Sequence, residues 1–237
     1  MLATGTARQA SVHLHADLHQ NAFADTARMT WALSPAPGVH RKMLERMGGE
    51  TVHRATSLVR FAPGARFEAH VHGGGEEFFV LDGVFSDASG DYPAGSYVRN
   101  PPYSAHAPFS DSGCTIFVKL GQIPLTDRRT IRIDSASFEA RWRPCPGGAQ
   151  SQLLYESAYE HVCLMRWPGA YQGQPVRFEN GVEIFVIKGA FKDEFGHHGP
   201  GSWLRLAAGQ SHAMQGVRDC EALVKSAHLA PSGRPAF

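Results

Sequence analysis

The sequence predicts an all-β protein made of two tandem β-barrel domains, and two observations carry this prediction. The 237 residues include 25 glycines and 15 prolines, and so many chain-breaking residues favour short strands and tight turns over long helices. The second half of the chain also repeats the first half. The length is enough for two domains of about 100–120 residues, each with its own hydrophobic core.

The repeat is visible when the sequence is shifted by 106 residues without a gap. Between the segments Glu77–Lys119 and Glu183–Lys225, 15 of 43 positions are identical. The shared positions include glycines at equivalent turns and one histidine, His106 in the first copy and His212 in the second. We therefore predict a tandem duplication with an N-terminal tail (1–12), a first domain (13–125) and a second domain (126–237).

Within each copy the local pattern is that of short strands. Runs such as ATSLVRFAP, EEFFVLDGVF and CTIFVKL are rich in Val, Phe and Thr and are bounded by Gly, Pro, Asp and Ser. The residues between Asp87 and Asp91 predict a hairpin turn. The segment KMLERM predicts at most one or two turns of helix.

Charge and composition exclude several classes of partner. The net charge is +1 and acidic and basic residues are interleaved, so neither nucleic acid nor an anionic membrane is expected as a partner. No apolar stretch approaches the roughly 20 residues of a membrane span, and the N-terminus lacks a signal-peptide pattern. We therefore expect a cytoplasmic protein with a small-molecule ligand, whose four cysteines, none in a CxxC pair, are buried thiols.

One stretch combines residues that bind metals. His70 and His72 lie two positions apart at the end of a strand-like run, so both should project from the same face. Three glycines then allow a sharp reversal before Glu76, and His106 follows on a later strand. Imidazoles and a carboxylate suit first-row divalent metals, so we predict that these four residues bind one such ion per chain and leave a coordination position open. Glu76 is also the candidate catalytic base.

The same residues carry a resemblance to a known family. The spacing Gly64, five residues, His70-x-His72, three residues, Glu76, six residues, Gly83 matches the first cupin motif, and GDYPAGSYVRNPPYSAH, ending at His106, matches the second. The chain resembles two tandem cupins, which are jelly-roll β-barrels, and more narrowly the cupin domain of ChrR-type anti-sigma factors and its stand-alone relatives. The resemblance implies that the four residues hold a metal, which is zinc in the anti-sigma proteins. Related cupins are iron, manganese or nickel dioxygenases, isomerases and decarboxylases, so the metal identity stays open.

The second domain lacks this ligand set. At the repeat offset, His70 is replaced by Val176, His72 by Phe178 and Glu76 by Val182, while His212 remains. We expect a degenerate cupin without a metal, in which His212 is a hydrogen-bonded core histidine.

Further residues are candidates for the ligand pocket of the first domain. Arg60 could point inward and hold an anionic substrate, or it could lie on the surface. Phe78, Tyr97 and Tyr103 are candidates for lining the pocket, and core packing is the alternative for each.

Two functions follow as hypotheses. The leading one is a metal-dependent, non-haem dioxygenase-type oxidoreductase that acts on a small organic molecule. The alternative is a non-catalytic zinc cupin that senses oxidants or a small ligand and signals to a partner protein. Only about a dozen residues precede the first cupin, where anti-sigma factors carry their sigma-binding domain, so we expect no direct sigma-factor binding. Exposed sheet edges favour a homodimer.

Overall fold

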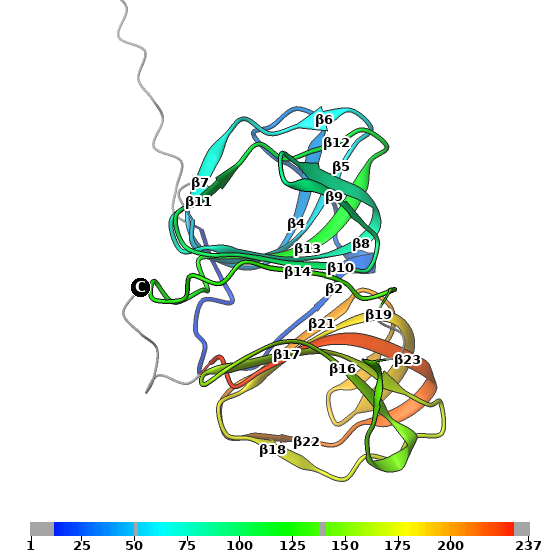
Figure 1. Ribbon diagram of the computed structural model, residues 1–237. Helices are drawn as coiled ribbons and strands as arrows, with labels where there is room; N and C mark the ends of the chain where they lie inside the picture. The colour runs from blue at the N-terminus through cyan, green and yellow to red at the C-terminus, as the bar shows by residue number, and fades with distance from the viewer. Residues whose placement is uncertain (1–11, 50–51, 138–140, 230–237) are drawn as a thin grey trace, which may run out of the picture.

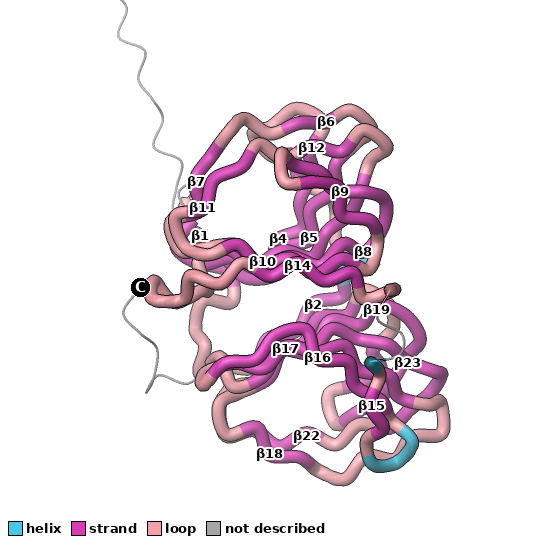
Figure 2. The backbone as a smooth tube through the Cα atoms, in the orientation of Figure 1, coloured by secondary structure: helices cyan, strands magenta, loops and turns pink. Residues whose placement is uncertain are grey.

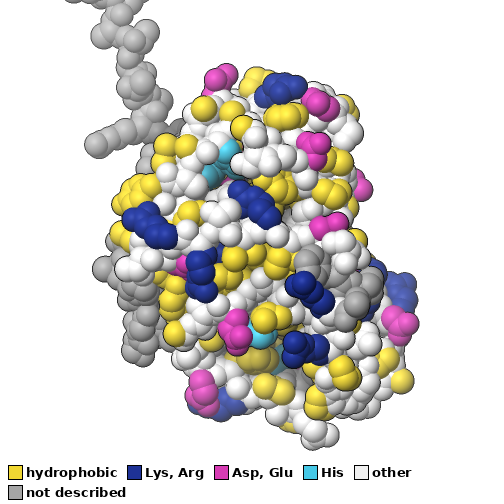
Figure 3. Space-filling model, viewed as in Figure 1, with side chains coloured by type: hydrophobic (Ala, Val, Ile, Leu, Met, Phe, Trp, Pro, Cys, Tyr) yellow, Lys and Arg dark blue, Asp and Glu magenta, His cyan; other side chains and the backbone are white. Residues whose placement is uncertain are grey.

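The computed structural model describes residues 12–49, 52–137 and 141–229, which form two β-barrels packed face to face (Figure 1). The all-β, two-domain prediction is confirmed: strands account for nearly all regular structure, as the backbone trace shows (Figure 2). No helix among the described residues is long and apolar enough to cross a membrane. On the face shown in Figure 3, basic and acidic side chains are scattered among apolar ones.

The strands of the first half are β1 (Val12–Leu14), β2 (Ala22–Asp25), β3 (Ala32–Leu33), β4 (Val39–Gly48), β5 (Val52–Phe61), β6 (Ala65–Arg66), β7 (His70–His72), β8 (Glu76–Asp87), β9 (Gly90–Pro93), β10 (Ser96–Asn100), β11 (Ser104–His106), β12 (Phe109–Ser110) and β13 (Cys114–Leu120). Those of the second half are β14 (Ile131–Asp134), β15 (Arg143–Pro144), β16 (Gln150–Ser157), β17 (Glu160–Trp167), β18 (Val176–Phe178), β19 (Val182–Asp193), β20 (Gly196–His198), β21 (Ser202–Leu206), β22 (Gln210–His212) and β23 (Gln215–Ser226). Two short 3-10 helices, η1 (Thr26–Arg28) and η3 (Pro146–Gly148), complete the described elements.

The two barrels exchange strands. In the first barrel the main sheet runs β1-β4-β5-β13-β8-β10-β14, so its last strand comes from the second half of the chain. In the second barrel the sheet runs β15-β16-β17-β23-β19-β21-β2, and its last strand comes from the N-terminal segment. The expected boundary at 125/126 therefore divides the sequence copies but not the sheets. The predicted N-terminal tail (1–12) and the predicted second domain (126–237) both include residues outside the described part of the chain.

The prediction of a helical turn or two at the segment KMLERM is wrong, because this segment lies within β4. A β-bulge between Met43 and Glu45 interrupts the pairing of β4 with β5. A bulge adds one residue to one strand and shifts the alternation of its side chains. The sequence here therefore shows no clean two-residue period.

Three hydrophobic clusters form the core of the described part of the chain. One fills the first barrel, around Phe78 and Phe85, and another fills the second barrel, around Phe191 and Leu204. The remaining cluster lies between the barrels, where the Phe117 ring stacks on its partner from β19, Phe185, with ring centroids 4.8 Å apart. Both faces of the central strands are thus buried, one inside a barrel and one against the other barrel.

Buried ion pairs cross the interface between the barrels reciprocally. The Lys225 ammonium lies 2.7 Å from Glu77 Oε2, and the equivalent Lys119 lies 2.6 Å from Glu183 Oε2. Arg99 also donates to Glu77, at 2.7 Å. Glu77 points outward from its own barrel and is buried against the second one. Burial alone would raise the pKa of Glu77, yet Lys225 and Arg99 outweigh it and lower this pKa to about 2.

Candidate metal centre

β7 presents two histidines to the inside of the first barrel. Alternation along the strand leaves Val71 63% exposed and turns His70 and His72 to the opposite face. β7 pairs with β11 so that His106 lies directly across from His70. These three imidazoles therefore come from neighbouring positions of a two-stranded ladder.

The glycine turn after β7 brings Glu76 to the same place. Gly75 has a φ of +74°, a conformation that side chains disfavour. A Cβ on Gly74 would lie 2.6 Å from the Cα atom of Gly121, so the backbone here passes too close for any side chain. Glu76 then begins β8, buried at 5% exposure. The reversal predicted from the sequence therefore depends on the absence of side chains at the turn.

The four predicted ligands converge. One nitrogen from each of His70, His72 and His106 lies within 4.8 Å of the others. The Nε2 atoms of His72 and His106 are 3.0 Å apart, and Glu76 Oε1 lies 3.7 Å from His72 Nε2. Glu76 Oε2 lies 3.5 Å from His106 Nε2. That these residues bind a metal stays a prediction, which this arrangement supports.

Neighbouring groups orient two of the rings and the carboxylate. His70 Nδ1 lies 2.7 Å from the Glu68 carbonyl oxygen, to which it donates, and His106 Nδ1 lies 3.1 Å from Asp87 Oδ2. These contacts leave the Nε2 lone pairs for the centre of the cluster. Asn100 donates to Glu76 Oε2 at 3.1 Å.

The electrostatics of the cluster fit a cation. Burial, aided by His70, lowers the pKa of His72 to about 4, so this ring is neutral at pH 7. Burial raises the pKa of the neighbouring Glu76, whose Oε1 atom lies 3.7 Å from His72 Nε2. This donor set, three nitrogens and one carboxylate, suits zinc, iron, manganese or nickel.

Sequence reasoning did not find the partner of His106. A signal for this partner was present in the sequence, because Asp87 and Asp193 are identical across the repeat at the end of β8 and β19.

We expect Asp87→Asn to weaken metal binding by about 10- to 100-fold, since a carboxylate partner fixes the tautomer and raises the basicity of a ligating histidine. Competition with a fluorescent chelator measures this affinity. Asp193→Asn is the matched control, and an equal loss in both variants would contradict the assignment.

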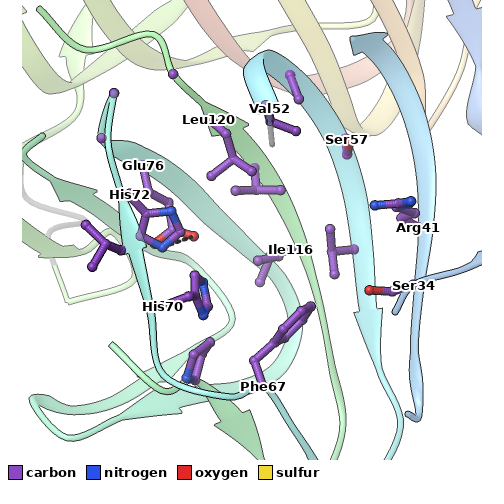
Figure 4. A pocket seen from close by; sticks show the side chains of 18 of the residues that line it. Ser34, Arg41, Val52, Ser57, Phe67, His70, His72, Glu76, Ile116 and Leu120 are labelled. Atoms are coloured by element: carbon purple, nitrogen blue, oxygen red, sulfur yellow. Dashed lines mark ion pairs between the residues drawn. The ribbon is translucent and has the colours of Figure 1, made fainter. Parts of the chain in front are cut away.

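The cluster opens onto a cavity of about 520 Å³ inside the first barrel. Figure 4 shows His70, His72 and Glu76 on one side of this cavity and Arg41 on the other. Apolar residues such as Ile116 lie between the two sides. A small molecule in the cavity would therefore contact the ligand cluster directly.

Comparison with known proteins decides the family. Residues 19–124 and 131–230 match the model of the ChrR cupin-like domain, which together is most of the chain. The chain belongs to this family. No curated protein sequence matches the chain.

Solved structures show the same two-barrel cupin fold at low sequence identity. A proposed dioxygenase from Nostoc punctiforme superposes with a TM-score of 0.71 at 14% identity, covering 91% of this chain and 86% of that one. The nickel(II) complex of the bacterial pirin YhhW from Escherichia coli gives 0.59 at 14% identity, over 89% and 100% of the two chains. Oxalate decarboxylase from Lactobacillus farciminis, in complex with formate, gives 0.63 at 10% identity, over 89% and 87%.

The other predicted pocket residues lie outside the lining of the cupin cavity. Arg60 is exposed on the outer face of β5, and its guanidinium lies 4.5 Å from the Trp31 ring centroid. Tyr97 is fully buried in the cluster between the barrels. Tyr103 is 60% exposed. Arg60 and Tyr97 thus have the surface and core-packing positions that were their alternatives, and the expectation that these three residues line the pocket is corrected.

Phe78 lies inside the first barrel but behind the cavity wall. Its ring centroid is 4.6 Å from that of Phe85, which lines the cavity. Phe78 therefore has the core-packing role that was the alternative.

In the second cupin, β18 and β22 repeat the ladder of β7 and β11, with Val176 opposite His212. His212 Nε2 and His198 Nε2 each lie 2.8 Å from an oxygen of Asp193. Glu194, which is exposed, also lies near Asp193 and His212. His212 is thus hydrogen-bonded within the barrel, in agreement with the expected role as a core histidine.

Proposed function

We propose that the protein is a metal-dependent enzyme of the non-haem dioxygenase type, which acts on a small organic molecule in the first cupin barrel. The observation that carries this proposal is that three of the four clustered residues, His70, His72 and Glu76, line the 520 Å³ cavity. A purely structural metal site is normally closed by its protein ligands, whereas a catalytic site keeps room for substrate. The likeness to a proposed dioxygenase supports the reaction type at the level of the fold.

The residues of the site have different proposed roles. His70, His72 and His106 would hold one divalent metal ion together with Glu76. A bound metal supplies Lewis-acid or redox chemistry at its open position. Glu76 is the candidate base, because its Oε2 atom is fixed by Asn100 while its carboxylate reaches the cavity.

A second candidate function is a non-catalytic zinc cupin that senses an oxidant or a small ligand. The match to the ChrR cupin-like domain favours it, and so does the presence of a cavity that a signal molecule could fill. The two functions share the metal site and differ in turnover.

Elemental analysis of the purified protein and an oxygen-uptake screen with small oxygenated organic compounds separate the two. We expect about one equivalent of iron or manganese per chain and ligand-dependent oxygen consumption. Glu76→Gln, assayed at saturating metal, is expected to lower turnover by about 10²–10⁴-fold, the usual contribution of a general base.

Glu179→Gln is the control, because this exposed carboxylate pairs with Arg177 at the surface of the second barrel. Zinc without turnover of any compound in the screen would reject the enzyme and support the sensor.

A further inference from the structure

Asp87, the partner of the predicted ligand His106, is held at both of its carboxylate oxygens. The Oδ2 atom lies 3.1 Å from His106 Nδ1. The Oδ1 atom accepts two hydrogen bonds, one from the Ser89 backbone N–H at 2.7 Å and one from the Tyr92 hydroxyl at 3.2 Å. Burial raises the pKa of Tyr92, so its hydroxyl keeps its proton at neutral pH and donates it. The donors on Oδ1 therefore fix the direction in which Asp87 presents Oδ2 to His106.

Tyr92 is in turn bound by a residue from the second half of the chain. Arg132 Nε donates to the Tyr92 hydroxyl oxygen at 2.9 Å, and the Arg132 guanidinium carbon lies 5.5 Å from the centroid of the Tyr92 ring. Arg132 belongs to β14, the strand that the second half of the chain adds to the first barrel beside β10 (Figure 2). A continuous chain of hydrogen bonds thus runs from the exchanged strand to the ligand cluster.

The second barrel repeats the inner part of this chain of hydrogen bonds. At the repeat offset of 106 residues, the positions of Asp87, Tyr92 and His106 are occupied by Asp193, His198 and His212. His198 Nε2 and His212 Nε2 each lie 2.8 Å from an oxygen of Asp193. Both barrels therefore place a polar side chain from the same repeat position against the shared aspartate.

The outer end of the chain differs between the two barrels. Arg132 pairs with Val98 of β10, whereas the equivalent residue of β21, Leu204, pairs with Phe23 of β2. The Phe23 side chain has no hydrogen-bond donor, and its ring packs on that of Phe195 with the centroids 4.9 Å apart. The arginine thus occurs in the barrel that has the ligand cluster, and a phenylalanine takes its place in the barrel that lacks it.

We propose that Tyr92 and Arg132 are positioning residues of the metal centre, which hold Asp87 and, through it, the His106 imidazole in the orientation that binds the metal. Hydrogen-bonded partners behind a ligand affect metal affinity although they do not touch the ion, and the members of such a chain strengthen one another. The inference rests on the metal site of the proposed function but not on turnover. It also gives β14 a part in metal binding, because the second half of the chain supplies Arg132.

The zinc affinity of the metal-free protein, measured by competition with a fluorescent chelator, tests the proposal. We expect Tyr92→Phe to weaken zinc binding by about 3- to 10-fold, the effect of one lost hydrogen bond. Arg132→Met keeps the unbranched side chain without its donors and is expected to weaken zinc binding by about 2- to 5-fold. Arg132→Lys keeps a donor and should restore part of the affinity. The double variant Tyr92→Phe/Arg132→Met should lose no more than Tyr92→Phe alone, because Arg132 acts through the Tyr92 hydroxyl.

The visible absorption spectrum of the cobalt(II)-substituted protein gives a second readout, because it reports how the ligands are arranged around the ion. We expect its bands to shift in Tyr92→Phe. Tyr159→Phe is the matched control, because it removes a hydroxyl that donates to another aspartate, Asp127, at the same distance of 3.2 Å. This control is expected to change neither the zinc affinity nor the cobalt spectrum.

Unchanged zinc affinity and an unchanged cobalt spectrum in Tyr92→Phe would overturn the proposal, and so would an equal loss of affinity in Tyr159→Phe. Losses that add in the double variant would show that Arg132 does not act through Tyr92, which contradicts its assigned role. If Tyr92→Phe does not fold, Arg132→Met and Arg132→Lys decide the question, because Arg132 is exposed. A wild-type protein that binds zinc without turnover would reject the proposed enzyme and leave this result intact, whereas a wild-type protein that binds no metal would overturn both.

Discussion

His106→Ala is expected to remove the bound metal, whereas His212→Ala is expected to leave the metal content unchanged. His106 supplies an Nε2 atom 3.0 Å from that of His72 and 3.5 Å from the Glu76 carboxylate. Its repeat counterpart, His212, uses Nε2 for a hydrogen bond to Asp193. Elemental analysis of dialysed protein compares the two variants directly.

The His106→Ala and His212→Ala variants control for each other, since each removes one imidazole from an equivalent position of the repeat. Far-ultraviolet circular dichroism shows whether each variant remains folded. If His212→Ala loses as much metal as His106→Ala, the second barrel takes part in metal binding and the assignment of a single site is wrong.

Glu77→Gln is expected to lower the free energy of unfolding by about 3–5 kcal/mol, as is usual when one partner of a buried ion pair is removed. The amide keeps the shape of the side chain but leaves the positive charges of Lys225 and Arg99 without this carboxylate. The equivalent Glu183→Gln is expected to have an effect of similar size, because Lys119 loses its partner in the same way. Urea-induced unfolding measures both variants.

Glu179→Gln provides the matched control, because Glu179 pairs with Arg177 at the surface, where both side chains are 60% or more exposed. Its expected effect on the free energy of unfolding is below about 1 kcal/mol.

The pH dependence of the free energy of unfolding has a defined sign. With its pKa lowered from 4.5 to about 2, Glu77 stabilises the fold above pH 4.5, and this stabilisation is lost as the pH falls toward 2. Glu77→Gln should lack that component, and equal shifts for Glu77→Gln and Glu179→Gln would argue against a stabilising role of the buried pair.

The repeat and the ligand spacing could be predicted from the sequence because both depend on local rules. Two-residue alternation places His70 and His72 on one face, and glycines mark the turn before Glu76. The repeat offset identified the position of the single retained histidine in the second copy. The placement of His70, His72 and Glu76 follows from this short-range geometry, whereas His106 reaches them through the pairing of β11 with β7.

The errors occurred at residues that lie on the outer face of a barrel strand. Tyr97 and Arg60 were expected in the pocket, but their strands present one face to the barrel interior and the other to the outside, and composition does not distinguish the two. Arg46, which lines the cavity, was missed because the bulge in β4 hides the period of two, so the segment KMLERM resembled a helix. Pairing between distant segments, such as β14 with β10, leaves no local signal in the sequence.

The exchange of β2 and β14 makes the two halves of the chain mutually dependent for folding. A protein cut after residue 125 would leave β10 without β14 along one edge, and the separated second half would lack β2 beside β21. An open edge of this kind readily pairs with another molecule. Each half therefore supplies an edge strand to the sheet of the other, so that the barrel with the His70, His72, Glu76 and His106 cluster is completed by the second half of the chain.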